Sequence, residues 1–175
     1  MKKLLYPTSM IMGAFIVLIS CQPKVDVEKE KVAVKDVIQN EVDAYMAKDF
    51  EKLYSLYIQD DLNTRLQETC SKEHPIYSGW NNVRTFLEDM AKHDNPENKN
   101  VKCLKDGFII KIRDNCAWVI NKDNWTWENN GVPGSIVGIQ TTFMEKIGGN
   151  WKIAMMSCFY RDQSNSELKD SIVVK

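Results

Sequence analysis

The fold is decided by the stretch 101-VKCLKDGFIIKIRDNCAWVINKDNWTWENNGVPGSIVGIQTTFMEKIGGNWKIAMMSCFYR-161. This stretch is rich in β-branched and aromatic residues, which favour strands, and turn residues interrupt it repeatedly. The predicted strands are Val101–Leu104, Phe108–Arg113, Cys116–Trp127, Ile136–Ile147 and Trp151–Arg161. Turns are expected at Asp106-Gly107, Asp114-Asn115, Gly131–Gly134 and Gly148-Gly149. Strands that follow one another through short turns form an antiparallel meander.

Three helices are predicted before the meander. Apolar residues recur every three or four positions between about Glu28 and Ala47, which predicts a long first helix. Asp49 is suited to cap a short second helix, which leads into an extended segment and a loop over 67–79. A third helix is expected over Trp80–Lys92. Helices followed by a meander indicate an α+β fold with the helices packed on one sheet face.

The first twenty residues have the pattern of an export signal. Lys2 and Lys3 precede an apolar run of ten residues, Met10–Ile19, whereas a membrane-spanning helix needs about 20. The segment Leu18-Ile19-Ser20-Cys21 resembles the lipobox of bacterial lipoproteins. We therefore expect cleavage before Cys21 and lipidation of its thiol, which would anchor the protein durably to a membrane. The alternative is a buried N-terminal helix that ends in an incidental cysteine.

Cleavage would divide the chain into a signal peptide (1–20), a tether (21–27), one domain (28–161) and a polar tail (162–175). The mature chain would have 155 residues, enough for one domain with a core. Residues 1–20 contain two lysines and no acidic residue, so 21 basic and 24 acidic residues remain, a net charge of −3. This balance argues against nucleic-acid binding. Gln22 after Cys21 favours the outer membrane within the cell envelope.

Four cysteines follow the lipidation candidate: Cys70, Cys103, Cys116 and Cys158. An even number in an exported protein permits disulfides. Three of them lie in predicted strands, so burial as small apolar side chains is the favoured interpretation. The sequence has no Cys-x-x-Cys motif and no histidine pair at ligand spacing, and we expect neither a zinc site nor a cofactor.

Three segments, taken in order, carry a family resemblance. The first is Tyr45–Phe50 with Leu53–Tyr57 and Asp60-Asp61, the second is Gly79–Phe86, and the third is Asn115–Val119 with Gly149–Ile153. Their order and spacing resemble the nuclear transport factor 2-like superfamily, in its SnoaL-like, ketosteroid-isomerase-like branch. The resemblance implies a cone: a curved antiparallel sheet wrapped around about three helices, with a pocket at the open end, often in a dimer.

The catalytic groups of ketosteroid isomerases do not come with this resemblance. Their phenol lies eight residues before the Asp of the inter-helix turn, and here that position is Glu41. Their general base lies five residues beyond the Asp-Asp pair, and here that position is Leu66, next to Arg65. Fold alone does not determine function. The catalytic residues, if any exist, are therefore not identified by the sequence.

Glu41 is nevertheless the most informative site candidate. At 100° per residue it lies within the apolar stripe of the first helix, together with Ile38 and Tyr45. A buried carboxylate needs a partner, and Arg65 is the first choice, with Arg84 second. The alternative is that Glu41 reaches water at the edge of the stripe. The full set of pocket candidates is Glu41, Tyr45, Tyr54, Tyr57, Arg65, Trp80 and Trp118.

Aromatic residues on the strands have two interpretations. Trp125 and Trp127 share one sheet face and could line the mouth of a pocket, although such residues commonly belong to a core or interface. On the last strand both faces are largely apolar. We expect Trp151, Ile153 and Phe159 inside the cone, which leaves Ala154, Met156 and Cys158 to be covered by a second subunit.

Three functions are compatible with these features. The leading hypothesis is a membrane-anchored exported lipoprotein whose domain binds a small, mostly apolar ligand in the cone pocket. The second is a small isomerase-, cyclase- or hydrolase-like enzyme with Glu41 as acid–base group. The third is a dimeric partner of another envelope protein.

Overall fold

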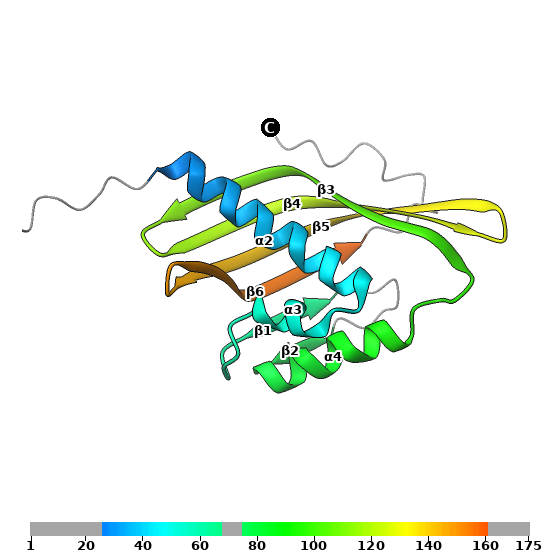
Figure 1. The fold of residues 1–175 in the computed structure, drawn as a ribbon, viewed down its shortest axis with the longest axis horizontal. Helices are drawn as coiled ribbons and strands as arrows, with labels where there is room; N and C mark the ends of the chain where they lie inside the picture. The colour runs from blue at the N-terminus through cyan, green and yellow to red at the C-terminus, as the bar shows by residue number, and fades with distance from the viewer. Residues whose placement is uncertain (1–25, 68–74, 161–175) are drawn as a thin grey trace, which may run out of the picture.

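The computed structural model describes residues 26–67 and 75–160, so Cys21, the tether and the polar tail lie outside the described residues. Within these residues, the helices before the main sheet are α2 (Val27–Ala47), α3 (Phe50–Ser55) and α4 (Trp80–Lys92). The strands are β1 (Thr64–Gln67), β2 (Ile76–Ser78), β3 (Asn98–Arg113), β4 (Cys116–Asn129), β5 (Val132–Ile147) and β6 (Asn150–Tyr160). The predicted α+β class is confirmed (Figure 1).

The first two helices begin at aspartate caps. Asp26 accepts a hydrogen bond from the backbone of Lys29, and Asp49 accepts one from Lys52. Lys48, between the helices, adopts a left-handed conformation with φ of 56°, which ends α2 and turns the chain. The predicted cap at Asp49 is therefore present, and α4 has the predicted bounds.

The sheet is mixed rather than purely antiparallel, which corrects the sequence prediction. Its strand order is β2-β1-β6-β5-β4-β3. The strands β3 to β6 form the expected antiparallel meander, but β1 pairs with β6 in parallel. Periodicity predicts pairing only between strands joined by turns. The β1–β6 pair is joined through α4 and the whole meander, so no local signal announces it.

Two β-bulges change which residues face inward. In β3 the register shifts between Asp106 and Ile109, so the expected turn at Asp106-Gly107 is a bulge inside one continuous strand. In β6 a bulge leaves Ala154 unpaired between Ile153 and Met155. Before the bulge in the sequence, Trp151 and Ile153 are buried as expected. After the bulge, Met156 and Cys158 are buried and Phe159 is exposed. The dimer surface predicted at Ala154, Met156 and Cys158 is therefore wrong, because the bulge inverts the alternation.

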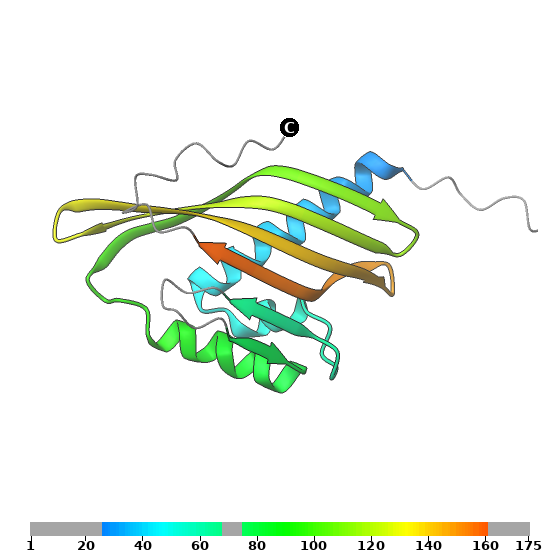
Figure 2. The ribbon, with the colours of Figure 1, turned by 180° about the vertical axis from the view of Figure 1, so that it is seen from behind.

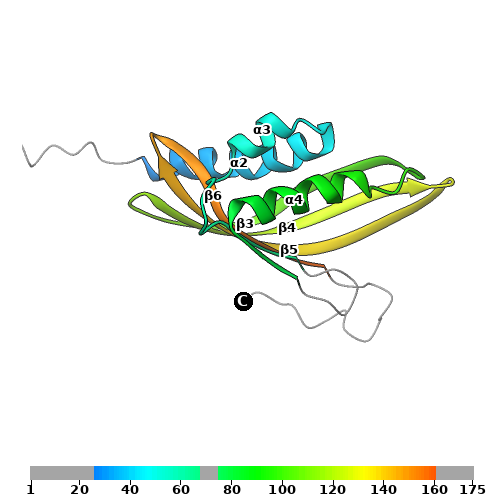
Figure 3. The same cartoon turned by 90° about the horizontal axis from the view of Figure 1, so that it is seen from below.

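All three helices cover one face of the sheet, and no described element covers the other (Figures 2 and 3). The core lies between the helices and the sheet. It is built from α2, α4 and the inward positions of β4 to β6, and includes Ile38, Leu87, Val119, Met144 and Ile153. The core fills only part of the space over the sheet; the remainder is the candidate site.

Candidate functional site

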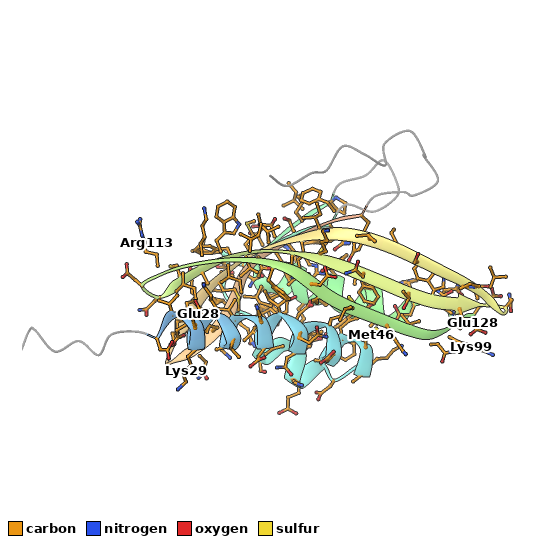
Figure 4. All side chains as sticks on the ribbon, turned by 90° about the horizontal axis from the view of Figure 1, so that it is seen from above. Glu28, Lys29, Met46, Lys99, Arg113 and Glu128 are labelled. Carbon is orange, nitrogen blue, oxygen red and sulfur yellow. The ribbon has the colours of Figure 1, made fainter. Side chains whose placement is uncertain are left out.

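A large cavity of about 820 Å³ opens between the C-terminal end of α2, the segment that joins α4 to β3, and the far halves of β4 and β5. Most of its lining residues are apolar or aromatic, including Tyr45, Met90, Trp125, Trp127, Ile136 and Tyr160, and Lys48, Lys92 and Asp94 add charged groups to the lining. Figure 4 places Met46, at its rim, toward the end of the molecule opposite Glu28 and Arg113. The lining residue Met46 and the start of α2 thus lie apart along the molecule.

A small cavity of about 30 Å³ adjoins the large one, because five residues line both. These shared residues are Tyr45, Gln67, Met90, Trp125 and Tyr160. Around the small cavity lie four buried charged residues: Glu41, Arg65, Lys105 and Asp123. The site is therefore a wide apolar space that narrows to a polar floor.

One side of the floor is formed by Glu41 and Arg65, the partner chosen for it from the sequence. Glu41 and Arg65 are each 5% exposed, and Arg65 Nη1 lies 3.3 Å from Glu41 Oε1. Tyr57 joins the pair: its hydroxyl donates to Glu41 Oε1 at 2.7 Å and accepts from Arg65 Nη1 at 2.9 Å. Burial and the adjacent carboxylate raise the pKa of Tyr57 well above its ordinary value, so the phenol stays protonated.

The other side of the floor is a second buried pair. Lys105 Nζ lies 3.0 Å from Asp123 Oδ1 and 2.6 Å from Gln140 Oε1, and Asn121 donates to the same aspartate oxygen at 2.8 Å. Burial is the largest single influence on the pKa of Lys105 and would lower it, but Asp123 and Glu41, with smaller contributions from Cys103 and Cys158, together raise it. Burial raises the pKa of Asp123, and Lys105 offsets part of that rise. We take the pair as ionised, because a cation and a carboxylate in contact stabilise one another.

Cys158 and Gln140 connect the two pairs. Arg65 Nη2 lies 3.9 Å from the Cys158 sulfur, which lies 3.9 Å from Gln140 Oε1. Burial raises the pKa of the Cys158 thiol to about 11, so at neutral pH it is no thiolate nucleophile. The floor is a continuous polar network with balanced charge.

Two glycines on β5 determine the shape of the wall. A Cβ at Gly134 would lie 2.4 Å from the ring of Trp127, and one at Gly138 would lie 2.7 Å from the ring of Tyr160. Real side chains do not approach so closely. The absent side chains thus allow both rings to lie against the sheet, which keeps the cavity open.

The predicted pocket residues fall into two groups. Glu41, Tyr45 and Arg65 line the small cavity, and Tyr57 lies directly behind it through its contacts with Glu41 and Arg65. Tyr54 and Trp80 instead pack against one another between α3 and α4, and Tyr54 donates to Glu88. Trp118 is 49% exposed on the uncovered sheet face and lines neither cavity. These last three line neither of the two adjoining cavities, because the helix pair and the sheet register place them elsewhere. Tyr54 lines a separate cavity of about 540 Å³ between α3 and α4.

The sequence prediction missed half of the floor. Lys105, Asp123, Gln140 and Gln67 were not among the candidates, although they lie inside. A signal existed for Asp123: it shares the inward face of β4 with Ala117, Val119 and Asn121 at a spacing of two. Lys105 was hidden by the bulge that follows it, because Asp106-Gly107 has the pattern of a turn.

The described cysteines Cys103, Cys116 and Cys158 are free thiols, and Cys70 lies outside the described residues. Cys158 is buried as predicted, whereas Cys116 is exposed at the start of β4, next to a turn. Within residues 26–67 and 75–160, no group of three or more His, Cys, Asp or Glu side chains converges on a possible metal position. Among the helices of these same ranges, none combines the length and apolar character needed to cross a bilayer.

No protein-family model matches the chain, and no curated protein matches it in sequence. Solved structures do match its fold. An NTF2-like protein from Novosphingobium aromaticivorans has a TM-score of 0.63 at 11% identity, over 89% of this chain and 91% of that one. An NTF2-like protein of unknown function from Shewanella oneidensis has a TM-score of 0.55 at 15% identity, over 74% and 98%.

The association domain of CaMKII from C. elegans is also similar, with a TM-score of 0.60 at 18% identity over 75% of this chain and 96% of that domain. At these identities the likeness establishes the fold alone. The chain therefore has the α+β cone fold of nuclear transport factor 2-like proteins, a fold shared by proteins of different functions.

Proposed function

We propose that this chain is an exported, membrane-anchored lipoprotein whose cone domain binds a small, mostly apolar ligand. The observation that carries the binding function is the large cavity. Its volume of about 820 Å³ lies in the range of small-molecule sites, roughly 300–1,000 Å³. Its aromatic wall would bury an apolar body, and the polar floor would orient the ligand.

Native mass spectrometry of the protein purified from its own host tests this binding function. We expect a bound small molecule at one per chain, released when the protein is denatured. A preparation that carries the bare mass only, and that takes up no apolar probe added afterwards, would contradict the proposal.

The anchor is proposed from Leu18-Ile19-Ser20-Cys21. With Cys21 lipidated, α2 would begin near the membrane, and the lining residue Met46, toward the other end of α2, would lie farther from it (Figure 4). The Cys21→Ser variant is expected to incorporate no labelled fatty acid, while Cys116→Ser, which removes an exposed thiol of the domain, labels normally. Unchanged labelling of Cys21→Ser would remove the anchor.

Acid–base catalysis is the second candidate function. Its supporting observation is that the carboxylates of Glu41 and Asp123 both border the small cavity. If the bound molecule is converted on incubation, Glu41→Gln should abolish conversion. Circular dichroism has to show that the variant is folded, because Arg65 loses its carboxylate partner. The matched control is Asp43→Asn, an exposed change on the same helix. Conversion that survives Glu41→Gln would exclude Glu41 as the acid–base group.

A homodimer is proposed through the uncovered sheet face. Trp118, Phe143 and Met155 are neighbours across β4, β5 and β6, and with the nearby Phe159 they form the outer-face patch, which is partly exposed. Exposed apolar patches commonly mark interfaces, and the CaMKII domain of the same fold is named for association.

Sedimentation equilibrium should show a dimer that Trp118→Lys dissociates and Val132→Lys, at an exposed hairpin, leaves intact. A monomer at high micromolar concentration would contradict it.

A further inference from the structure

Three residues that line the small cavity have a buried side-chain atom with no hydrogen-bond partner among the described residues: Arg65, Gln67 and Trp125. Arg65 and Gln67 are the two that lie on β1. Gln67 is 6% exposed and Arg65 is 5% exposed. Among the described residues, Gln67 Oε1 and Arg65 Nε have no hydrogen-bond partner. Both residues line the small cavity, and they lie two positions apart on β1, so their side chains project from the same face. A buried polar atom without a partner costs stability unless something else satisfies it.

The two atoms require opposite partners. Gln67 Oε1 accepts hydrogen bonds, whereas Arg65 Nε donates one. The terminal nitrogens of Arg65 are already occupied by Glu41, Tyr57 and Cys158. A single group that satisfies both atoms has to donate and accept at once, as a hydroxyl does.

The volume and charge of the floor restrict which chemical group of a ligand can enter the small cavity. A space of about 30 Å³ is the size of one water molecule or one hydroxyl group. The charges of Glu41 and Arg65 and of Lys105 and Asp123 cancel in pairs, so a charged ligand head would be buried without a counter-ion. An uncharged head fits this floor better than a carboxylate or an amine.

We propose that the ligand is a hydroxyl-bearing aromatic or similarly rigid apolar molecule, whose hydroxyl enters the small cavity and binds Gln67 Oε1 and Arg65 Nε. This inference rests on the proposed binding function. The apolar body lies in the large cavity against Trp125, Trp127 and Tyr160, whose flat rings favour a flat ligand.

Three naphthalenes that differ in one substituent test the inference on the purified full chain. They are 2-naphthol, 2-methylnaphthalene and 2-naphthoate, with a hydroxyl, a methyl and a carboxylate at the same position. Binding is followed by calorimetry and by tryptophan fluorescence. We expect 2-naphthol to bind at least about tenfold more tightly than either of the others, the amount expected when two buried polar atoms gain partners.

Gln67→Met keeps the length of the side chain and removes the acceptor. It should reduce the preference for 2-naphthol to roughly threefold or less, while the affinity for 2-methylnaphthalene stays within about twofold. Gln59→Met, an exposed change, should leave both affinities unaltered. Circular dichroism verifies folding, and the preference of the unmodified chain is decisive even if Gln67→Met does not fold.

The possible contrary results of the naphthalene experiment lead to different conclusions. Equal affinities for naphthol and methylnaphthalene would overturn the inference, as expected if one water molecule permanently fills the small cavity, and would leave the proposed binding function intact. Tightest binding of 2-naphthoate would overturn it in favour of an anionic head. A preference that survives in Gln67→Met would overturn the assignment to Gln67. No binding of any probe would overturn both the inference and the proposed function.

Discussion

The inward face of the sheet has an apolar half and a polar half, although both are equally buried. On β4 the alternation passes from Ala117 and Val119 to Asn121 and Asp123, and on β5 it passes from Met144 to Gln140. The apolar half packs against α2 and forms the core. The polar half contains charged side chains, and burying them costs free energy relative to leaving them in water. Burial alone thus does not make a residue part of the core, and a polar half retained at this cost indicates a site.

Breaking the buried ion pair between Lys105 and Asp123 should give the largest effect on stability. Asp123→Leu leaves Lys105 charged, buried and unpaired, and we expect a loss of about 3–5 kcal/mol in the free energy of unfolding. The double variant Lys105→Met with Asp123→Leu should recover most of that loss, because the uncompensated charge is gone. Urea denaturation measures both. A single variant that costs under about 1 kcal/mol would show that the pair is not buried as described.

Truncation in the apolar half should be costly for a different reason. Met144→Ala leaves a hole in a fully buried position, with an expected loss of about 2–5 kcal/mol. Affinity for a cavity probe should not change, since Met144 lines neither cavity. Phe143→Ala, on the outer face of the same strand, is the control and should cost less. A selective loss of probe binding in Met144→Ala would erase the distinction between the two halves.

Adding one methyl group to the wall of the large cavity tests how that cavity is kept open. In Gly134→Ala the new Cβ would meet Trp127 at 2.4 Å, so the ring must move. We expect a loss of about 1–3 kcal/mol and weaker probe binding. Ser135→Ala, which points to the opposite face, should change neither measurement. Normal probe binding in Gly134→Ala would show that Trp127 is not needed as a wall.

The smallest effect is expected far from the polar half, at the start of α2. Glu30 accepts hydrogen bonds from Lys146 at 2.6 Å and Trp151 at 2.7 Å, and these lower its pKa from the ordinary value of 4.5. A lowered pKa adds stability above pH 4.5 that is lost as the pH falls through the lowered value. Glu30→Gln should lose roughly 1 kcal/mol or less at neutral pH and flatten the decline on the acid side. Denaturation between pH 7 and 3 measures this.

Glu28→Gln, an exposed change two residues earlier, is the control for Glu30 and should follow the unmodified protein at every pH. An acid branch of the stability curve that is identical in Glu30→Gln and the unmodified protein would contradict the assigned hydrogen bonds.

The sequence predicted where the helices and strands lie better than it predicted which of their side chains face inward. Helix spacing placed Glu41 inside the apolar stripe, because helical periodicity is strict. Arg65 was chosen as its partner from the family resemblance, because it stands next to the position of the isomerase-type base. The alternation along β6 failed at Ala154, where one extra residue inverts every later side chain. Bulges have no dependable signal in a single sequence. The same cause hid Lys105, since the bulge after it resembles a turn.

Contacts between segments far apart in the sequence were the other feature that could not be predicted. Gln67 borders both cavities only because β1 pairs in parallel with β6, far along the chain. No local pattern encodes that pairing. The polar residues of β4 could have been found, because Asn121 and Asp123 continue the inward alternation of Val119.

The central claim, that the large cavity binds an apolar ligand, is tested most directly by blocking it. Ile136 lines the cavity, and Val137, its neighbour on β5, is partly exposed on the outer face. The chain should bind the fluorescent probe N-phenyl-1-naphthylamine at one site. Ile136→Trp should weaken that binding by at least about tenfold, which is roughly 1.4 kcal/mol, and Val137→Trp should leave it unchanged. Equal binding by all three proteins would contradict the claim.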